Sequence, residues 1–185
     1  MSVRDEQRER VTGRLAAHLL ETGLTQSSLR QLARAAGVSD RMLLYYFADK
    51  TEVLSAATAQ IAAQTVGGLA EALPEGTKLR PRELVILAAQ ITAGPQMRRF
   101  MRLWVEMIAA AAKGEEPFVT ISGQVMASFK HWLAARLDVP ADTDPVATAG
   151  VIIALIDGLA LVDICSSAAD MQATHRALAV LFDST

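Results

Sequence analysis

A short stretch near the N-terminus holds basic, hydroxyl-bearing and aromatic side chains at a spacing that suits nucleic-acid binding. In AAGVSDRMLLYYFADK, residues 35–50, Arg41 precedes two adjacent tyrosines, and Lys50 closes the segment. A guanidinium can bond both acceptors of a guanine edge, and tyrosine and lysine can donate to phosphate oxygens. The same aromatic side chains would also suit the interior of a small helical domain. The elements that carry them decide between the two.

Two short helices joined by a tight turn are expected around this stretch. Ser27 or Ser28 can cap the first helix, and Ser39 can cap the second, which runs through Tyr46. Gly37 stands between them, where a left-handed residue ends a helix. Inward packing is expected of Leu32, Ala33, Val38, Leu43 and Phe47. This spacing is typical of a helix-turn-helix, whose second helix enters a major groove, although a plain α-hairpin inside a bundle would share it.

A family resemblance favours the DNA-binding alternative. Residues 27–54, SSLRQLARAAGVSDRMLLYYFADKTEVL, resemble the N-terminal signature of TetR-family transcriptional regulators. The matching positions are Ser28, Arg30, Leu32, Ala33, Ala36, Gly37, Val38, Ser39, Leu43, Tyr46, Phe47, Lys50 and, within a residue, Val53-Leu54. The resemblance implies an all-α, nine-helix TetR-like architecture. A three-helix helix-turn-helix DNA-binding domain, residues 1–49, would pack on a helical effector-binding and dimerisation domain, residues 50–185.

The resemblance and the residue chemistry together predict a DNA-binding surface. Its candidate residues are Ser28, Arg30, Ser39, Asp40, Arg41, Met42, Tyr45, Tyr46 and Lys50. The chain departs from the family at residues 41–44, where Arg-Met-Leu-Leu replaces the usual Gly-Thr-Leu-Tyr. Two backbone contacts common in the family are therefore in doubt, and Arg41 either replaces them or is simply solvated. Arg4 and Arg8 could also reach the DNA backbone, but a solvated charged helix end is the favoured interpretation.

Helical periodicity dominates the whole chain, and no stretch alternates convincingly at period two. The first helix is expected over Val3 to Thr22, and a D-x-x-E capping box at Asp49 and Glu52 is expected to open the fourth. Later helices are expected to begin near Pro81, Pro95, Pro117, Pro145 and Met171, with the seventh closing around Asp138. Nine helices and no linker between independent domains make an all-α protein.

Composition and charge exclude several classes of protein. The net charge is −2, yet residues 1–50 hold eight Arg or Lys against six Asp or Glu, which permits a DNA-facing N-terminal part. The single cysteine excludes an internal disulfide framework, and the charged N-terminus is unlike a signal peptide, so we expect a cytoplasmic protein. The three histidines are scattered and no phosphate-binding loop is present. We therefore predict no enzyme activity, no metal and no cofactor.

The most apolar segment, GVIIALIDGLALVDIC at residues 150–165, is predicted to serve as a dimer helix. Two aspartates make it a poor membrane span and a better buried helix. Small residues recur every four positions and would let two helices approach closely. The resemblance implies that the last two long helices form a four-helix dimer interface. The predicted dimer residues are Gly150, Ala154, Gly158, Val151, Leu155 and Val162, with Leu159 also expected to need a partner. The alternative is that this stripe packs against its own core.

Methionine and aromatic side chains on the middle helices form a candidate effector pocket. Such side chains make adaptable apolar walls, although they are also ordinary core residues. The candidate pocket residues are Met97, Phe100, Met101, Trp104, Met107, Met126, Phe129 and Asp157. Asp157, Asp163 and Glu106 lie among apolar neighbours, so each needs a partner, such as Arg98, Arg99 or Arg102, a helix N-terminus or a cationic ligand.

The sequence thus predicts a sequence-specific DNA-binding transcriptional regulator, a homodimer on a near-palindromic operator, with no membrane partner. It is expected to be a repressor released by a small apolar or amphiphilic effector. The alternative is a helical ligand-binding or interaction protein that has lost DNA recognition, which the Arg-Met-Leu-Leu substitution keeps open.

Overall fold

The computed structural model describes residues 2–183 and shows an all-α fold over that range. The helices are α1 (Val3–Thr22), α2 (Leu29–Ala36), α3 (Asp40–Tyr46), α4 (Lys50–Ala72), α5 (Pro81–Thr92), α6 (Pro95–Ala112), α7 (Phe118–Ala134), α8 (Pro145–Cys165) and α9 (Ala168–Asp183). A short 3₁₀-helix, η1 (Gly23–Gln26), follows α1. The nine α-helices within residues 2–183 confirm the predicted fold class and helix number.

Side-chain caps set most of the helix starts, and two boundaries differ from the expected ones. Ser167 accepts from the Asp170 amide at 3.2 Å, so α9 begins three residues before the expected Met171. The seventh helix ends at Ala134 rather than near Asp138. Its continuation pairs instead with Leu79, whose amide donates to the Arg136 carbonyl at 2.9 Å and whose carbonyl accepts from the Asp138 amide at 2.8 Å. Helix bonding and this pairing compete for the same backbone groups.

The start of α4 differs in detail from a capping box. Asp49 caps the helix as expected, because its carboxylate accepts from the Glu52 amide at 2.8 Å. The Glu52 carboxylate, however, accepts from the Ala48 amide at 2.6 Å, one residue before the position that a capping box uses. Glu52 therefore fixes the link between α3 and α4.

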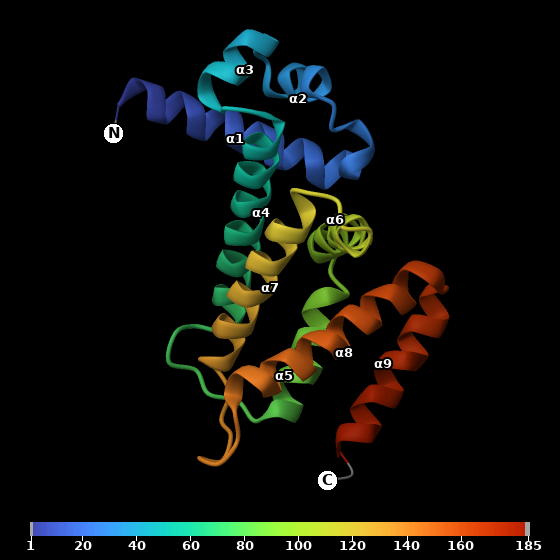
Figure 1. Cartoon of the computed structure of the whole chain (residues 1–185). Helices are drawn as coiled ribbons and strands as arrows, with labels where there is room; N and C mark the ends of the chain where they lie inside the picture. Colours follow the sequence, from blue (N-terminus) through green and yellow to red (C-terminus); the bar gives the residue numbers. More distant parts are fainter. Residues whose placement is uncertain (1, 184–185) are drawn as a thin grey trace. The chain divides into compact units, whose positions relative to one another are not determined.

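The chain forms two compact units. The first contains Met1–Gly68 and Arg102–Val125, and the second contains Leu69–Met101 and Met126–Thr185. The first unit includes the whole predicted helix-turn-helix, with α2 and α3 on the same side of α1 (Figure 1). Its fully buried side chains include Leu15, Leu19, Leu32, Leu43 and Phe47. The functional division at residues 49 and 50 stays a prediction.

The second unit is built around α5, α8 and α9. Helix α5 packs against both others, and α9 returns beside α8 (Figure 1). Leu84 and Val85 of α5, Leu133 and Leu137, and Ala149 and Ile152 of α8 form its main core. Buried Arg136 secures the end of α7, because its Nε donates to the Leu73 carbonyl at 2.9 Å and its guanidinium lies 4.0 Å from the Trp132 ring centre.

Helix α8 is buried on one face only. In the described part of the chain it is the one helix long and apolar enough to cross a membrane, judged by length and composition, and 17% of its most apolar window is buried. Leu159 lies inside the unit beside Ala89 and Met171, so the expectation that Leu159 needs a partner on another chain was wrong. The opposite face of α8 is exposed.

Candidate nucleic-acid interface

The turn between α2 and α3 has the geometry of a helix-turn-helix. Gly37 adopts the left-handed conformation, with φ of 71° and ψ of 31°, and its amide donates to the Arg34 carbonyl at 3.1 Å. The Arg14 guanidinium of α1 donates to the Ala36 carbonyl at 3.0 Å. A Cβ at position 37 would lie 2.6 Å from the Arg14 Nη1. The left-handed backbone thus favours glycine here, and a side chain would in addition displace the end of Arg14.

Helix α3 has a buried and an exposed face. Leu43 and Phe47 are buried, with exposed fractions of 0% and 1%, as predicted. Met42 and Tyr45 are exposed by 40% and 57%, and Asp40 and Arg41 also lie on the surface. Tyr46 is half-buried and meets the Tyr45 ring edge-on, with ring centres 5.4 Å apart. The face of α3 that could meet DNA therefore presents the candidate residues and none of the core.

The remaining candidates lie at helix starts. Ser28 and Ser39 are the N-caps of α2 and α3, and their hydroxyl groups accept from the amides of Gln31 and Met42. Ser28 also donates to the Gln31 side chain at 2.5 Å, so its hydroxyl is already engaged. Arg30 and Lys50 are exposed in the first turns of α2 and α4. The structure brings the nine candidates to the surface, and their contact with DNA stays a prediction.

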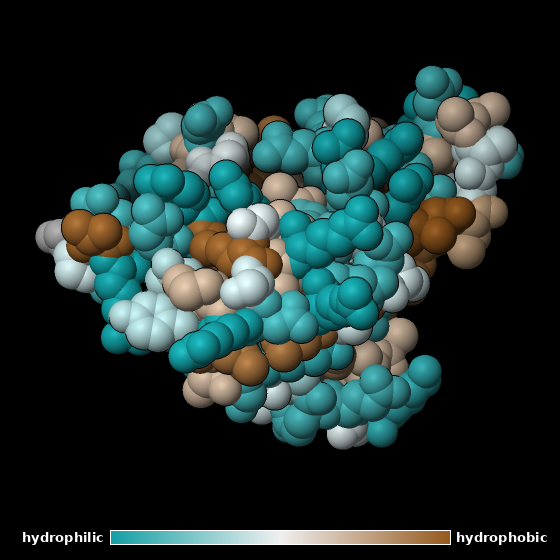
Figure 2. Space-filling model, turned by 90° about the horizontal axis from the view of Figure 1, so that it is seen from above, coloured by the Kyte–Doolittle hydropathy of each residue, from teal (hydrophilic) through white to brown (hydrophobic). Residues whose placement is uncertain are grey.

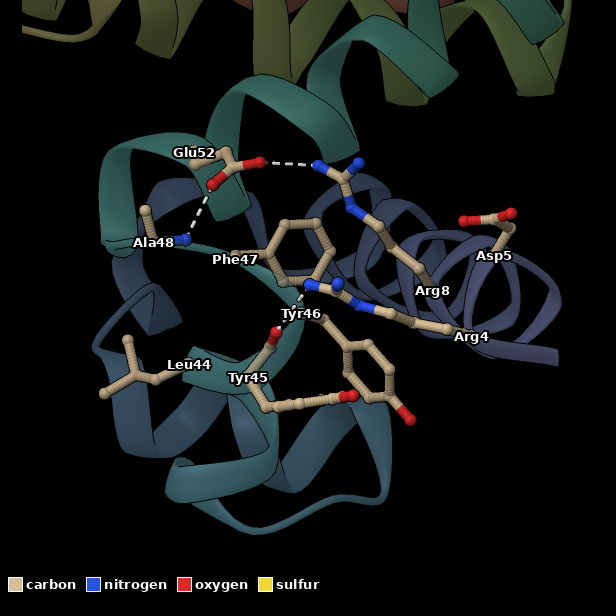
Figure 3. A pocket seen from close by; sticks show the side chains of 9 residues that line it. All are labelled: Arg4, Asp5, Arg8, Leu44, Tyr45, Tyr46, Phe47, Ala48 and Glu52. Carbon is tan, nitrogen blue, oxygen red and sulfur yellow. Dashed lines mark hydrogen bonds and ion pairs between the residues drawn. The ribbon is translucent and has the colours of Figure 1, made fainter. Parts of the chain in front are cut away.

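A depression of about 440 Å³ lies where the start of α1 meets the end of α3 (Figure 3). Arg8 of α1 pairs with Glu52 at 2.5 Å, and its guanidinium lies 5.0 Å from the Phe47 ring centre. Arg4 donates to the Tyr45 carbonyl at 3.3 Å and lies 4.9 Å from the Tyr45 ring centre. The basic start of the first helix was the sequence signal for Arg4, but sequence could not show that it reaches α3.

The surface viewed from the end that carries α2 and α3 is mainly hydrophilic, with separate hydrophobic patches (Figure 2). Val3, Met42 and Leu44 are exposed apolar side chains of the first unit.

At the start of α1, hydrogen bonds from Ser2 hold the pKa of Asp5 below its ordinary value. Asp5 is therefore ionised at neutral pH, where it caps α1 and leaves the local charge a mixture of basic and acidic groups.

The predicted pocket residues fall into both units. Trp104 and Met107 belong to the first unit and are buried, whereas the others belong to the second. Met101 is buried there, and Met97, Phe100, Met126, Phe129 and Asp157 are partly buried. Phe100 and Phe129 are 5.9 Å apart between ring centres, tilted by 49°. The effector role of these residues stays a prediction.

Asp163 and Glu106, which were expected to need partners, each accept a hydrogen bond in the described structure. Asp163 of α8 accepts from Arg98 of α6 at 2.9 Å, one of the partners considered from sequence. Glu106 of α6 accepts from the Leu24 amide at 2.6 Å, so its partner is a backbone group of η1 rather than an arginine. No group of three or more metal-binding side chains exists among residues 2–183.

Four of the six predicted dimer residues, Val151, Ala154, Leu155 and Val162, lie on the exposed face of α8. Val151, Leu155 and Val162 are exposed by 63%, 37% and 39%. Ala154 is exposed, and Gly150 and Gly158 are partly buried, with Gly150 lying against the Lys130 side chain. Val180 and Leu181 of α9 add exposed apolar surface of 64% and 73%.

Comparison with known proteins gives one sequence match and many fold matches. Residues 15–57 match the family model of bacterial regulatory proteins, tetR family. No curated protein matches the chain by sequence. The matched segment contains the last eight residues of α1, all of η1, α2 and α3, and the start of α4.

Solved structures share the fold over nearly the whole chain. A TetR-family transcriptional regulator from Cytophaga hutchinsonii superposes with a TM-score of 0.75 at 18% identity, covering 100% of this chain and 96% of that one. The multidrug binding protein EbrR, complexed with proflavin, gives 0.64 at 24% identity, covering 95% and 99%. The transcriptional regulator FadR from Bacillus subtilis, complexed with stearoyl-CoA, gives 0.61 at 16% identity, covering 94% and 96%.

The family match falls on the helix-turn-helix, and the fold match extends over the helices that follow it. Members of the matched family are DNA-binding regulators rather than enzymes. Residues 15–57 therefore match the N-terminal domain of the tetR family of bacterial regulatory proteins, and the chain as a whole shares the fold of solved TetR-family regulators.

Proposed function

We propose that this protein is a homodimeric repressor that binds a near-palindromic operator in the cytoplasm and is released by a small apolar or amphiphilic effector. The observation that carries the DNA-binding part is the division of α3 into a buried face, Leu43 and Phe47, and an exposed face, Arg41, Met42 and Tyr45. A rigid recognition helix of this kind enters the major groove with its N-terminal residues toward the bases.

Arg41 and Lys50 have different proposed roles. Arg41 lies in the first turn of α3 and is exposed, so it can reach a base edge, where a bidentate contact to guanine contributes about 1–3 kcal/mol of discrimination. Lys50 is the first residue of α4, where a cation opposes the helix dipole. A nearby phosphate would offset this cost, so Lys50 is proposed to fix the position of the duplex without reading its sequence.

The exposed face of α8, with Val180 and Leu181 of α9, is proposed to pair two copies of the chain. These apolar side chains are costly to leave in water and suit a self-complementary interface. A dimer would present two α3 helices to half-sites roughly 34–36 Å apart, one turn of the duplex.

The effector is proposed to bind within the second unit, near Phe100 and Phe129. The partly buried methionine and phenylalanine side chains there can repack around an apolar ligand. Proflavin in EbrR and stearoyl-CoA in FadR support this class, since both ligands have large apolar parts. The effector would act by binding better to a dimer whose two α3 helices do not match the half-sites.

A gel shift on the DNA that flanks the protein's own gene tests the proposal. Lys50→Ala should weaken binding to every duplex alike, whereas Arg41→Ala should weaken binding to the operator and also reduce discrimination between sequences. Lys113→Ala is the matched control, because it removes an exposed lysine at the end of α6. If Arg41→Ala and Lys50→Ala both bind as tightly as the wild type, the assigned surface is wrong.

A further inference from the structure

Two arginines one turn apart at the start of α1 both approach the end of α3, and they have different partners. Arg8 is engaged by Glu52, which also holds the Ala48 amide at 2.6 Å (Figure 3). One carboxylate therefore ties α1, the end of α3 and α4 together. Because the charge of Arg8 is already paired with the Glu52 carboxylate at 2.5 Å, Arg8 would add less net attraction to a phosphate than an unpaired arginine.

Arg4 is in no ion pair within the described residues. Its side chain is exposed and reaches from α1 to the end of α3, where one Nη2 hydrogen bond goes to the Tyr45 carbonyl at 3.3 Å. A guanidinium has five donors, so most of its hydrogen-bonding capacity remains unused by that carbonyl. Figure 3 shows Tyr45 and Tyr46 beside Arg4, with both hydroxyl groups on the same side of the depression.

The Tyr45 ring holds the Arg4 guanidinium in place. The guanidinium lies 4.9 Å from the ring centre, within the range of a cation–π contact, and the carbonyl bond fixes its direction. Such a preorganised arginine loses less side-chain freedom when it binds an anion than a freely moving one. Tyr45 itself is on the exposed face of α3 that is proposed to meet DNA.

We infer that Arg4 and Tyr45 form a phosphate-binding pair that extends the DNA interface from α3 onto α1, while Arg8 is a structural residue. This inference rests on the proposed DNA binding and adds a contact outside the helix-turn-helix. The Arg4 guanidinium and the Tyr45 hydroxyl both bind one phosphate of the duplex backbone, and this contact does not depend on the base sequence.

Salt-dependent binding tests the pair without knowledge of the operator. Fluorescence anisotropy measures binding to a labelled duplex of arbitrary sequence over a series of salt concentrations. Arg4→Gln should weaken binding several-fold and lower the slope of log K against log salt by about one, because one fewer counterion is released. Arg10→Gln, six residues further along α1 and so on a different side of the helix, removes the same charge and should leave the slope unchanged.

A double-mutant cycle distinguishes a pair from two separate contacts. Tyr45→Ala removes the ring that holds Arg4, so Arg4→Gln should have a smaller effect in that background than in the wild type. Arg8→Gln should lower the thermal stability and leave the salt slope near that of the wild type. Circular dichroism of each variant checks that the helices remain formed.

The outcomes separate this inference from the proposed function. A wild type that binds duplex DNA, with an Arg4→Gln variant of equal affinity and equal slope, overturns the phosphate pair and leaves the DNA-binding proposal standing. Additive effects of Arg4→Gln and Tyr45→Ala overturn the pairing. A wild type that binds no duplex at low salt overturns the proposed function and this inference with it.

Discussion

The helix-turn-helix in the first unit and the α8–α9 hairpin in the second unit expose different kinds of side chain. In α3, apolar Leu43 is wholly buried, and the exposed face combines charged and aromatic side chains with the apolar Met42 and Leu44. In α8, apolar Val151, Leu155 and Leu161 are exposed by 63%, 37% and 51%. The exposed face of α3 therefore carries charged and hydroxyl groups that can form directed hydrogen bonds. The exposed face of α8 carries aliphatic side chains, which can only pack against another apolar surface.

The two regions differ in how strongly their structure restricts the residue type at each position. Recognition by α3 depends on a fixed backbone, with Gly37 and the caps Ser28 and Ser39 at defined positions. Few residue types satisfy each of these positions. An apolar pairing surface or pocket can be built from many combinations of Val, Leu, Ile and Met, so its sequence is far less restricted.

Neighbouring leucines of α3 give the largest predicted difference. Leu43→Ala should lower the free energy of unfolding by about 2–5 kcal/mol, because it leaves a cavity at a fully buried position. Leu44→Ala, the matched control, should change it by no more than about 0.5 kcal/mol, because Leu44 is 45% exposed. Urea unfolding measures both. Equal losses would mean that α3 has no distinct buried face.

A charge on α8 should show that its exposed face pairs two chains. Val151→Glu should raise the dimer dissociation constant by about tenfold to a hundredfold, since the carboxylate would lose its water at the interface. Analytical ultracentrifugation over a dilution series measures this constant. Val119→Glu, at an exposed position of α7, is the control and should not change it. An unaffected dimer in Val151→Glu would assign the interface elsewhere.

Substitution of two glycines with positive φ separates backbone strain from crowding. Gly37 lies at the α2–α3 turn, and Gly114 follows α6. Gly114→Ala should cost about 1–2 kcal/mol for its φ of 75° alone, because no atom lies within 4 Å of the new Cβ. Gly37→Ala should cost about 1 kcal/mol more, because its Cβ displaces Arg14 from the Ala36 carbonyl. The extra cost should vanish in an Arg14→Ala background. Equal costs for Gly37→Ala and Gly114→Ala in the wild type would show that Arg14 adapts freely.

The smallest expected effect concerns the pKa values of two carboxyl groups at helix starts, one in each unit. Ser2 lowers the pKa of Asp5 in α1, and hydrogen bonds from Arg80 lower the pKa of Glu83 in α5. A lowered folded-state pKa means that each carboxylate stabilises the fold above its ordinary pKa of 3.8 or 4.5, and that this contribution is lost as pH falls through the folded-state value.

Carbon-detected NMR titration should resolve these two carboxyl groups. Ser2→Ala should return the pKa of Asp5 toward 3.8 and leave the pKa of Glu83 unchanged. Arg80→Gln should return the pKa of Glu83 toward 4.5 and leave the pKa of Asp5 unchanged. A pKa of Asp5 that stays low without the Ser2 hydroxyl would assign the effect to the helix dipole and nearby arginines instead.

Local sequence signals predicted most of the fold. Prolines at residues 81, 95 and 145, and serine caps at residues 28 and 39, placed the helix starts, because these residues act on their own backbone. The end of α7 was missed, since its pairing with Leu79 joins residues far apart in sequence. The inward position of Phe47 followed from its spacing of four residues from Leu43, and both side chains are buried.

Side-chain partners were harder to predict than helices. Arg98 was among three arginines considered for Asp163, and sequence had no means to choose among them. Glu106 bonds a backbone amide of η1, an element that helical periodicity does not show. The sequence also did not show the different contacts of Arg4 and Arg8, because these depend on which of the two arginines pairs with Glu52. Such partners are fixed by tertiary packing rather than by spacing.

Selection of binding sites from a randomised duplex library shows whether a dimer of this chain reads operator DNA through two copies of α3. We expect enrichment of an inverted repeat whose half-site centres lie about one helical turn apart, since one dimer must present both copies of α3. Selection with Arg41→Ala should give the same repeat with relaxed preference at one position in each half-site. Recovery of no enriched sequence by the wild type, or of a single unrepeated site, would contradict this expectation.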